Sequence, residues 1–334
     1  MKKTLLLVAA AVALVACSNE EIVRQSAPEA IGFDNAFVEN STRSVNDPSF
    51  DADNMFSDFA VYGFVEGAVL LDGVRVAKED LATDQTKTGW EYEGTQYWVA
   101  GAKYNFNAVA PLTDGGWTKT AATKDATTLS FTNNGTTDLL YAYATAEGQA
   151  ENNQPVAFTF RHTLSKVKLS FENAYNATNA TIKVRDVKIT DAYATGNVVL
   201  TDATAWSTQD GKLELAFGNA VADDATSTDA LAFAYNTTLE SYNELFMIPG
   251  EGPTLDGEKH TYTVTFTVDL IVSGTVVKTY ERTINAVFAP EAGKSYDLKA
   301  TINAENIDPE HAQEPIEFTV NALPGWGTTN DQNI

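Results

Sequence analysis

A two-residue repeat of apolar and polar side chains runs through most of this chain. It is longest near residue 265, where every second residue is apolar: Tyr262, Val264, Phe266, Val268, Leu270 and Val272. Shorter repeats of the same kind occupy residues 104–108, 156–160, 167–171, 213–217, 296–302 and 316–320. A period of two is typical of β-strands with one buried face. Turn-rich spacers separate these stretches, and only the mixed residues 76–83 suggest a short helix. The pattern therefore predicts an all-β protein built as a sandwich or a barrel rather than around a parallel sheet.

One long repeat changes phase. Ile182 and Val184 are apolar at even positions, whereas Val187 and Ile189 are apolar at odd positions. An extra residue in a strand shifts the alternation in this way. We therefore expect a β-bulge or strand bend between residues 184 and 187.

The N-terminus has the pattern of a bacterial lipoprotein signal. Lys2 and Lys3 precede an apolar run at residues 5–16, which is too short to span a bilayer, and Cys17 follows it. This pattern predicts that Cys17 receives a diacylglycerol and becomes the mature N-terminus, with fatty acyl chains such as palmitate. The absence of Asp from Ser18-Asn19 favours the outer membrane. The alternative is a cleaved secretory peptide in which the cysteine has no role.

Length and charge restrict the class of protein further. The chain has 334 residues, which favours two domains after the signal peptide, and the polar residues 146–155 suggest the boundary. We expect a signal peptide at 1–16, an N-terminal segment at 17–43, and domains at 44–157 and 158–334. The formal net charge of −23 would repel nucleic acid, so we expect no DNA or RNA partner.

The sequence lacks the motifs of common catalytic and metal centres. Cys17 is the only cysteine, and His162, His260 and His311 are too far apart in sequence for a paired zinc-ligand spacing. Nucleophile elbows, phosphate-binding glycine loops and calcium-loop spacings are also missing. His162 is interpreted as a hydrogen-bonded residue of a strand. We expect no enzymatic activity, no cofactor and no metal.

Several short stretches resemble a known family when they are taken in order behind the lipoprotein signal. They are residues 30–33, 42–43, 104–111, 138–142, 160–167, 245–249, 293–296 and 316–326. Together they resemble the fimbrillins, the lipoprotein-precursor pilins of type V pili. The resemblance implies two β-sandwich domains with transthyretin-like topology, export as a lipoprotein, and proteolytic removal of the first strand before polymerisation. It implies no enzymatic activity.

Two segments of this chain match those roles. Ile31, Phe33 and Phe37 share one face of an early extended segment that ends near Arg43, so cleavage after Arg43 is expected to free a removable first strand. Near the C-terminus, Ile316, Phe318 and Val320 alternate with polar residues and precede Trp326, which makes this segment the candidate donor strand. The alternatives are that Arg43 is an ordinary loop arginine and that residues 316–322 close their own C-terminal sheet.

The expected function is that of a structural subunit, in the stalk of a surface fimbrium that supports adhesion or biofilm formation. Its expected partners are other pilus subunits, and a lipid anchor is expected to hold the precursor in the outer membrane before maturation. The alternatives are a fimbrial anchor or tip subunit and, from another class, a monomeric surface lipoprotein that binds glycans.

Overall fold

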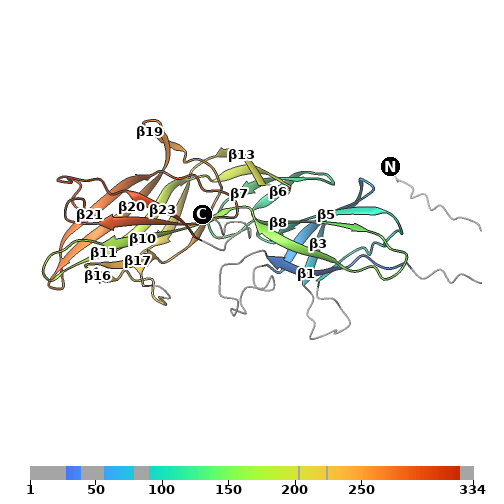
Figure 1. The fold of residues 1–334 in the computed structure, drawn as a ribbon, viewed down its shortest axis with the longest axis horizontal. Helices are drawn as coiled ribbons and strands as arrows, with labels where there is room; N and C mark the ends of the chain where they lie inside the picture. Colours follow the sequence, from blue (N-terminus) through green and yellow to red (C-terminus); the bar gives the residue numbers. More distant parts are fainter. Residues whose placement is uncertain (1–27, 39–55, 79–89, 202–203, 223–224, 324–334) are drawn as a thin grey trace, which may run out of the picture.

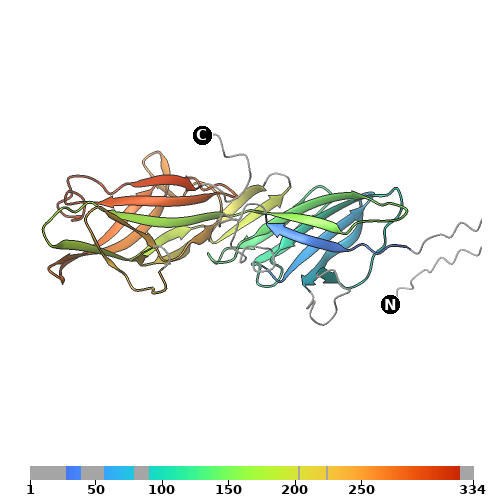
Figure 2. The same ribbon diagram turned by 60° about the horizontal axis from the view of Figure 1, so that its bottom comes forward.

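The computed structural model describes residues 28–38, 56–78, 90–201, 204–222 and 225–323, and these residues form strands and turns but no helix. Accordingly, this part of the chain contains no helix with the length and apolar character needed to cross a membrane. The molecule is elongated, with the N-terminal strands at one end and the C-terminal strands at the other (Figures 1 and 2). The all-β prediction is confirmed.

The strands of the N-terminal half pair in a ring, in the order β1-β4-β3-β2-β5-β8-β9 and back to β1. They are β1 (Phe33–Val38), β2 (Asp58–Val65), β3 (Ala68–Lys78), β4 (Trp90–Tyr92), β5 (Lys103–Ala110), β8 (Leu140–Glu147) and β9 (Val156–His162). Two links of the ring are short, since one residue pair joins β1 to β4 and two pairs join β8 to β9. Aromatic side chains dominate the enclosed core, including Phe33, Phe59, Phe106, Phe158 and Phe160.

A second sheet packs against the outer face of this ring at β2, β5 and β8. Its order is β13-β12-β7-β6, formed by β6 (Trp117–Ala122), β7 (Thr127–Thr132), β12 (Thr195–Leu200) and β13 (Thr204–Asp210). Leu129 and Val198 of this sheet pack in one core with Tyr62, Val109 and Tyr141 of the ring. The residues of β2 from Asp58 to Phe64 are therefore all buried, because its two faces belong to different cores. The N-terminal half therefore has two cores, one enclosed by the ring and one between the ring and the second sheet.

The same sheet joins the two halves of the chain. Strand β12 pairs with β7 from Thr195↔Thr132 to Leu200↔Thr127, although β12 lies beyond the predicted domain boundary at residues 157/158. The Trp206 indole Nε1 donates a hydrogen bond to the Thr163 carbonyl at 2.8 Å and strengthens the connection. In Figure 1 these strands lie in the middle of the molecule.

The C-terminal half contains two further sheets around one core. The first has the order β15-β17-β10-β22-β23, with β18 paired to β10; the second has the order β14-β11-β20-β19, with β16 on β11 and β21 on β20. The strands are β10 (Ser165–Asn173), β11 (Ala180–Ala192), β14 (Leu213–Gly218), β15 (Ala220–Val221), β16 (Ala232–Ala234), β17 (Thr237–Ser241), β18 (Leu245–Met247), β19 (Thr254–Asp256), β20 (Lys259–Val272), β21 (Thr275–Ala286), β22 (Ser295–Ile302) and β23 (Phe318–Leu323). Val167, Val184, Phe266 and Leu298 fill the space between the sheets.

Local predictions agree with these strands in most places. The expected bulge is present in β11, where the register against β20 shifts between Arg185 and Lys188 and Asp186 has a φ of 56°. The suggested helix at residues 76–83 is wrong for its described part, because Val76 and the following two residues end β3. Val76 is fully buried there and pairs with Phe59 and Tyr92, so tertiary packing decides its conformation.

Candidate strand-exchange site

Strand β1 completes the ring by lying between β9 and β4. It runs parallel to β9, with Phe33 opposite Val156 and Asp34 opposite Ala157, and it meets β4 through the single antiparallel pair Phe33↔Trp90. Most of its backbone pairing is therefore with β9. Parallel pairing is slightly less stable per residue than antiparallel pairing.

The start of β1 is anchored in the aromatic core. The exposed fraction is 2% for Ile31 and 1% for Phe33. The Phe33 ring lies 5.3 Å from Tyr92, 5.9 Å from Phe106 and 5.7 Å from Phe158, measured between ring centroids. Ile31 also donates a backbone hydrogen bond to the Gln96 carbonyl at 2.8 Å. These contacts place two residues of the predicted removable strand in the core.

The second half of β1 has a different register. Between Asp34 and Phe37 the strand advances three residues while β9 advances two, which is the geometry of a bulge. Phe37 is consequently paired with Thr159, whose side chain is exposed, and Val38 with the buried Phe160. The regular alternation that grouped Phe37 with Ile31 and Phe33 is interrupted before it reaches Phe37. A bulge leaves part of the ladder unpaired, so this half of β1 has fewer regular contacts with β9.

A polar contact fixes the residue that leads into β1. The Glu29 carboxylate accepts hydrogen bonds from the backbone N–H groups of Asn152 and Asn153 at 2.8 and 2.6 Å. It also accepts one from the side-chain Nδ2 of Asn153 at 2.7 Å. These three hydrogen bonds lower the pKa of Glu29, and the side-chain bond from Asn153 has the largest effect. The polar segment at residues 146–155, which suggested the domain boundary, therefore holds the residue that leads into β1.

The candidate donor strand lies in the other half of the molecule. Strand β23 pairs antiparallel with β22 through six residue pairs, from Ser295↔Leu323 to Ala300↔Phe318, and within the described residues it has no other partner strand. Ile316 is buried with an exposed fraction of 2%, whereas Phe318 and Val320 are half-buried against the same core. Here the C-terminal segment closes its own sheet, at an edge. The structure does not bring it together with β1.

The remaining predicted residues, Cys17, Arg43 and Trp326, lie outside the described residues. Lipid attachment at Cys17 and cleavage after Arg43 stay predictions, as does the role of Trp326 behind the donor strand.

His162 is hydrogen-bonded, as expected, and its partner is Asp138, which no local sequence pattern connects with it. The Nδ1 atom of His162 pairs with Oδ2 of Asp138, and both side chains are buried at the point where β8 and β9 meet. Both residues lie in stretches that carry the fimbrillin resemblance, which is the only sequence signal that relates them. The pair lies beside the short β8–β9 link of the ring, where it adds a side-chain connection.

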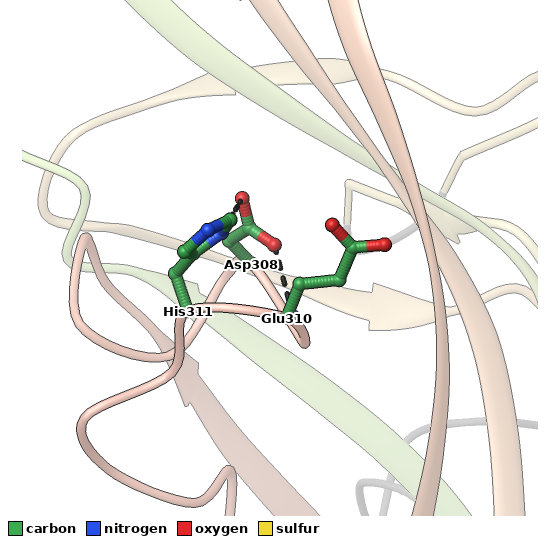
Figure 3. A group of neighbouring side chains, drawn as sticks. All are labelled: Asp308, Glu310 and His311. Carbon is green, nitrogen blue, oxygen red and sulfur yellow. Dashed lines mark hydrogen bonds and ion pairs between the residues drawn. The ribbon is translucent and has the colours of Figure 1, made fainter.

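A small group of possible metal ligands occurs at Asp308, Glu310 and His311 (Figure 3). The Asp308 carboxylate is already occupied: Lys278 Nζ lies 2.7 Å from it and His311 Nδ1 lies 3.3 Å from it. These bonds lower the pKa of Asp308 to about 2, and the bond from Lys278 has the largest effect. One possible ligand atom of each of the three residues lies within 4.8 Å of the others, but Figure 3 draws no bond from the Glu310 carboxylate to the other two side chains. Lys278 and His311 both bind the Asp308 carboxylate, so the geometry is that of a surface ion-pair network.

Comparison with known proteins identifies the family. The model of the family described as fimbrillin-like matches residues 42–322. The chain belongs to the fimbrillin-like family. This membership places it among structural components of cell-surface fimbriae, which associate with other fimbrial subunits, rather than among enzymes.

Solved structures with a similar fold include candidate cell adhesion proteins and a fimbrial anchor. A candidate cell adhesion protein of Bacteroides ovatus ATCC 8483 has 16% identity and a TM-score of 0.47, covering 90% of this chain and 98% of its own. One from Bacteroides eggerthii DSM 20697 has 15% identity and a TM-score of 0.46, with coverage of 89% and 93%. The fimbrial anchor protein Mfa2 of Porphyromonas gingivalis has 13% identity and a TM-score of 0.39, with coverage of 90% and 99%. Among curated proteins, none matches the sequence significantly.

Proposed function

We propose that this fimbrillin-like protein is a stalk subunit of a type V pilus that supports adhesion or biofilm formation. The precursor is exported as an outer-membrane lipoprotein through Cys17, is cleaved after Arg43, and polymerises when a neighbour's C-terminal strand replaces β1. The observation that carries this proposal is the position of β1, which fills an aromatic groove but is held mainly along one edge.

Loss of β1 would leave a site that favours another strand. The rings of Tyr92, Phe106 and Phe158 would lose their contact with Phe33, and the backbone edge of β9 would lose its partner. Burial of one large apolar side chain stabilises a protein by about 1.5–3 kcal/mol, so an empty groove of this kind is unfavourable in water. An open strand edge also pairs readily with an extended segment of another chain.

The proposed cleavage site supports this role. Arg43 lies between β1, which ends at Val38, and β2, which begins at Asp58, so a cut after Arg43 separates β1 covalently from the rest of the protein. The lipid-bearing Cys17 would leave with it. One cut would therefore release the membrane anchor and open the groove together.

The position of β23 supports its role as the donor. It is an edge strand with a single partner, and its apolar residues are only half-buried from Phe318 onwards. Its release breaks one ladder and leaves β10 and β22 paired with each other. A strand with this position is detached at lower cost than a central strand.

Arg43→Ala is expected to abolish polymerisation while the lipidated precursor still folds and reaches the surface. The reason is that β1 stays covalently attached and keeps the groove filled. Protein sheared from cells is examined for heat-sensitive ladders on denaturing gels, and the subunits are sequenced from their N-termini; wild-type subunits are expected to begin at Ser44.

Arg24→Ala is the matched control for this experiment, because Arg24 precedes β1 and cleavage there would leave the groove occupied. It is expected to polymerise normally. Normal fibres from Arg43→Ala would contradict the cleavage role, and assembled subunits that keep an acylated Cys17 would instead indicate an anchor subunit. A product that binds glycans and remains strictly monomeric would contradict the pilin function.

A further inference from the structure

The C-terminal half contains a buried arginine. Arg282 lies on β21 with an exposed fraction of 7%, opposite Phe266 of β20, and its side chain points into the sandwich as those of Tyr280 and Ala286 do. Its Nη1 atom donates a hydrogen bond of 3.4 Å to the Ile307 carbonyl. Its Nε atom is buried and has no hydrogen-bond partner among the described residues.

This guanidinium also lacks a paired carboxylate. Within the described residues no ion pair of Arg282 is formed; the nearby Asp308 is bound instead to Lys278 at 2.7 Å. Burial lowers the pKa of Arg282, with a smaller opposing effect from Asp308. A buried charge that is incompletely hydrogen-bonded and not neutralised is costly, because water would solvate it better than the protein does. The closed domain therefore contains a local source of instability.

The segment over Arg282 leads directly into the candidate donor strand. We call residues 303–317, which connect β22 to β23, the strap. The strap supplies the Ile307 carbonyl to Arg282, and it inserts Ile307 and Ile316 into the core, each with an exposed fraction of 2%. Beyond the strap, the Phe318 ring of β23 packs at 6.4 Å against Phe266, the cross-strand neighbour of Arg282.

We propose that Arg282 is a release element for the C-terminal strand: the strap and β23 close over an unneutralised guanidinium, and their detachment returns it to water. The apolar contacts of Ile307 and Ile316 and the Lys278–Asp308 ion pair hold the strap down. The buried charge of Arg282 opposes these contacts. It lowers the stability of the closed domain, so that the strap and β23 can detach. This inference rests on the proposed donation of β23, and it adds the feature that regulates the donation.

Replacement of Arg282 by methionine tests this inference, since methionine has a similar length, no charge and a flexible side chain that fits irregular spaces. Hydrogen exchange is measured at the backbone amides of Phe318–Leu323 in the unassembled full-length protein. Arg282→Met is expected to slow their exchange about tenfold or more, because the closed state no longer buries a charge. Lys278→Met is expected to have the opposite effect, since it removes the ion pair that fastens the strap.

Arg185→Met is the matched control. Arg185 lies on β11 of the same sheet, but its guanidinium is paired with Asp269 and Asp186 and not with a residue of the strap. It is expected to leave the exchange of β23 unchanged. Unchanged or faster exchange in Arg282→Met would overturn the proposal. Failure of both Arg282→Met and Arg282→Leu to fold would also overturn it, because the guanidinium would then support the closed domain.

The exchange measurement is independent of assembly. If the wild-type protein never polymerises, the proposed pilin function fails while the effect of Arg282 on β23 still holds. If wild-type subunits polymerise and Arg282→Met leaves both exchange and assembly rate unchanged, the pilin function stands and the release element is wrong.

Discussion

The double variant Lys299→Cys/Thr319→Cys is expected to remain monomeric when oxidised and to polymerise after reduction. Lys299 and Thr319 face each other in the β22–β23 ladder, where Cα atoms of opposite residues lie about 4.5–5.5 Å apart, within the range of a disulfide. The bond would tie β23 to its own sheet, so the strand could not be donated. The only native cysteine, Cys17, leaves with β1 in the proposed maturation and does not compete.

Thr265→Cys/Thr283→Cys is the matched disulfide for comparison. These residues face each other in the β20–β21 ladder, so their bond leaves β23 free. The oxidised control is expected to assemble like the wild type, as judged by ladders on denaturing gels and by negative-stain microscopy. If the oxidised β22–β23 variant assembles as fast as the control, β23 is not the donor.

Phe33→Ala is expected to destabilise the precursor strongly and to have no effect on the cleaved subunit. Loss of a fully buried phenylalanine costs about 3–5 kcal/mol, and Phe33 contacts three aromatic rings in the N-terminal core. Once cleavage after residue 43 has removed β1, residue 33 is no longer part of the folded protein. Urea unfolding of the precursor and of the cleaved protein, followed by tryptophan fluorescence, measures both free energies.

Phe171→Ala provides the comparison for this prediction, because Phe171 is equally buried but lies in the C-terminal core. It is expected to destabilise the precursor and the cleaved subunit alike. If Phe33→Ala also destabilises the cleaved protein, β1 stays bound after cleavage and the groove does not open.

Features set by neighbouring residues were predictable from the sequence. The alternation from Tyr262 to Leu270 matches β20, and the phase shift after Val184 matches the bulge of β11. Such features depend on which face of a strand is buried, and this is encoded every second residue along the strand itself. The burial of Ile31 and Phe33 was predictable for the same reason.

Features set by distant residues were not predictable in this way. Strand β1 is parallel to β9, β10 is parallel to β22, and β12 joins β7 across the predicted domain boundary. Alternation identifies a strand but not its partner or direction, so these pairings have no local signal. The same limit applies to the bulge before Phe37, which arises only in the register against β9.

The candidate strand-exchange site, like the fold, was predictable only in part from the sequence. Its apolar residues follow from the alternation, whereas the position of β23 at the edge of its own sheet follows from packing. The placement of Arg282 beneath the strap depends on the return of residues 303–317 over β21, which the sequence of β21 alone does not show.

Cross-linking between two populations of subunits tests whether the tail of one subunit occupies the place of β1 in the next. One population carries Ala157→Cys, an exposed position of β9 opposite Asp34 of β1, and the other carries Thr319→Cys on β23. After maturation each subunit has a single cysteine, so any bond made by a short bis-maleimide must join two subunits. We predict covalent dimers between the two populations in assembled fibres; fibres that form normally without such dimers would show that β23 does not take the place of β1.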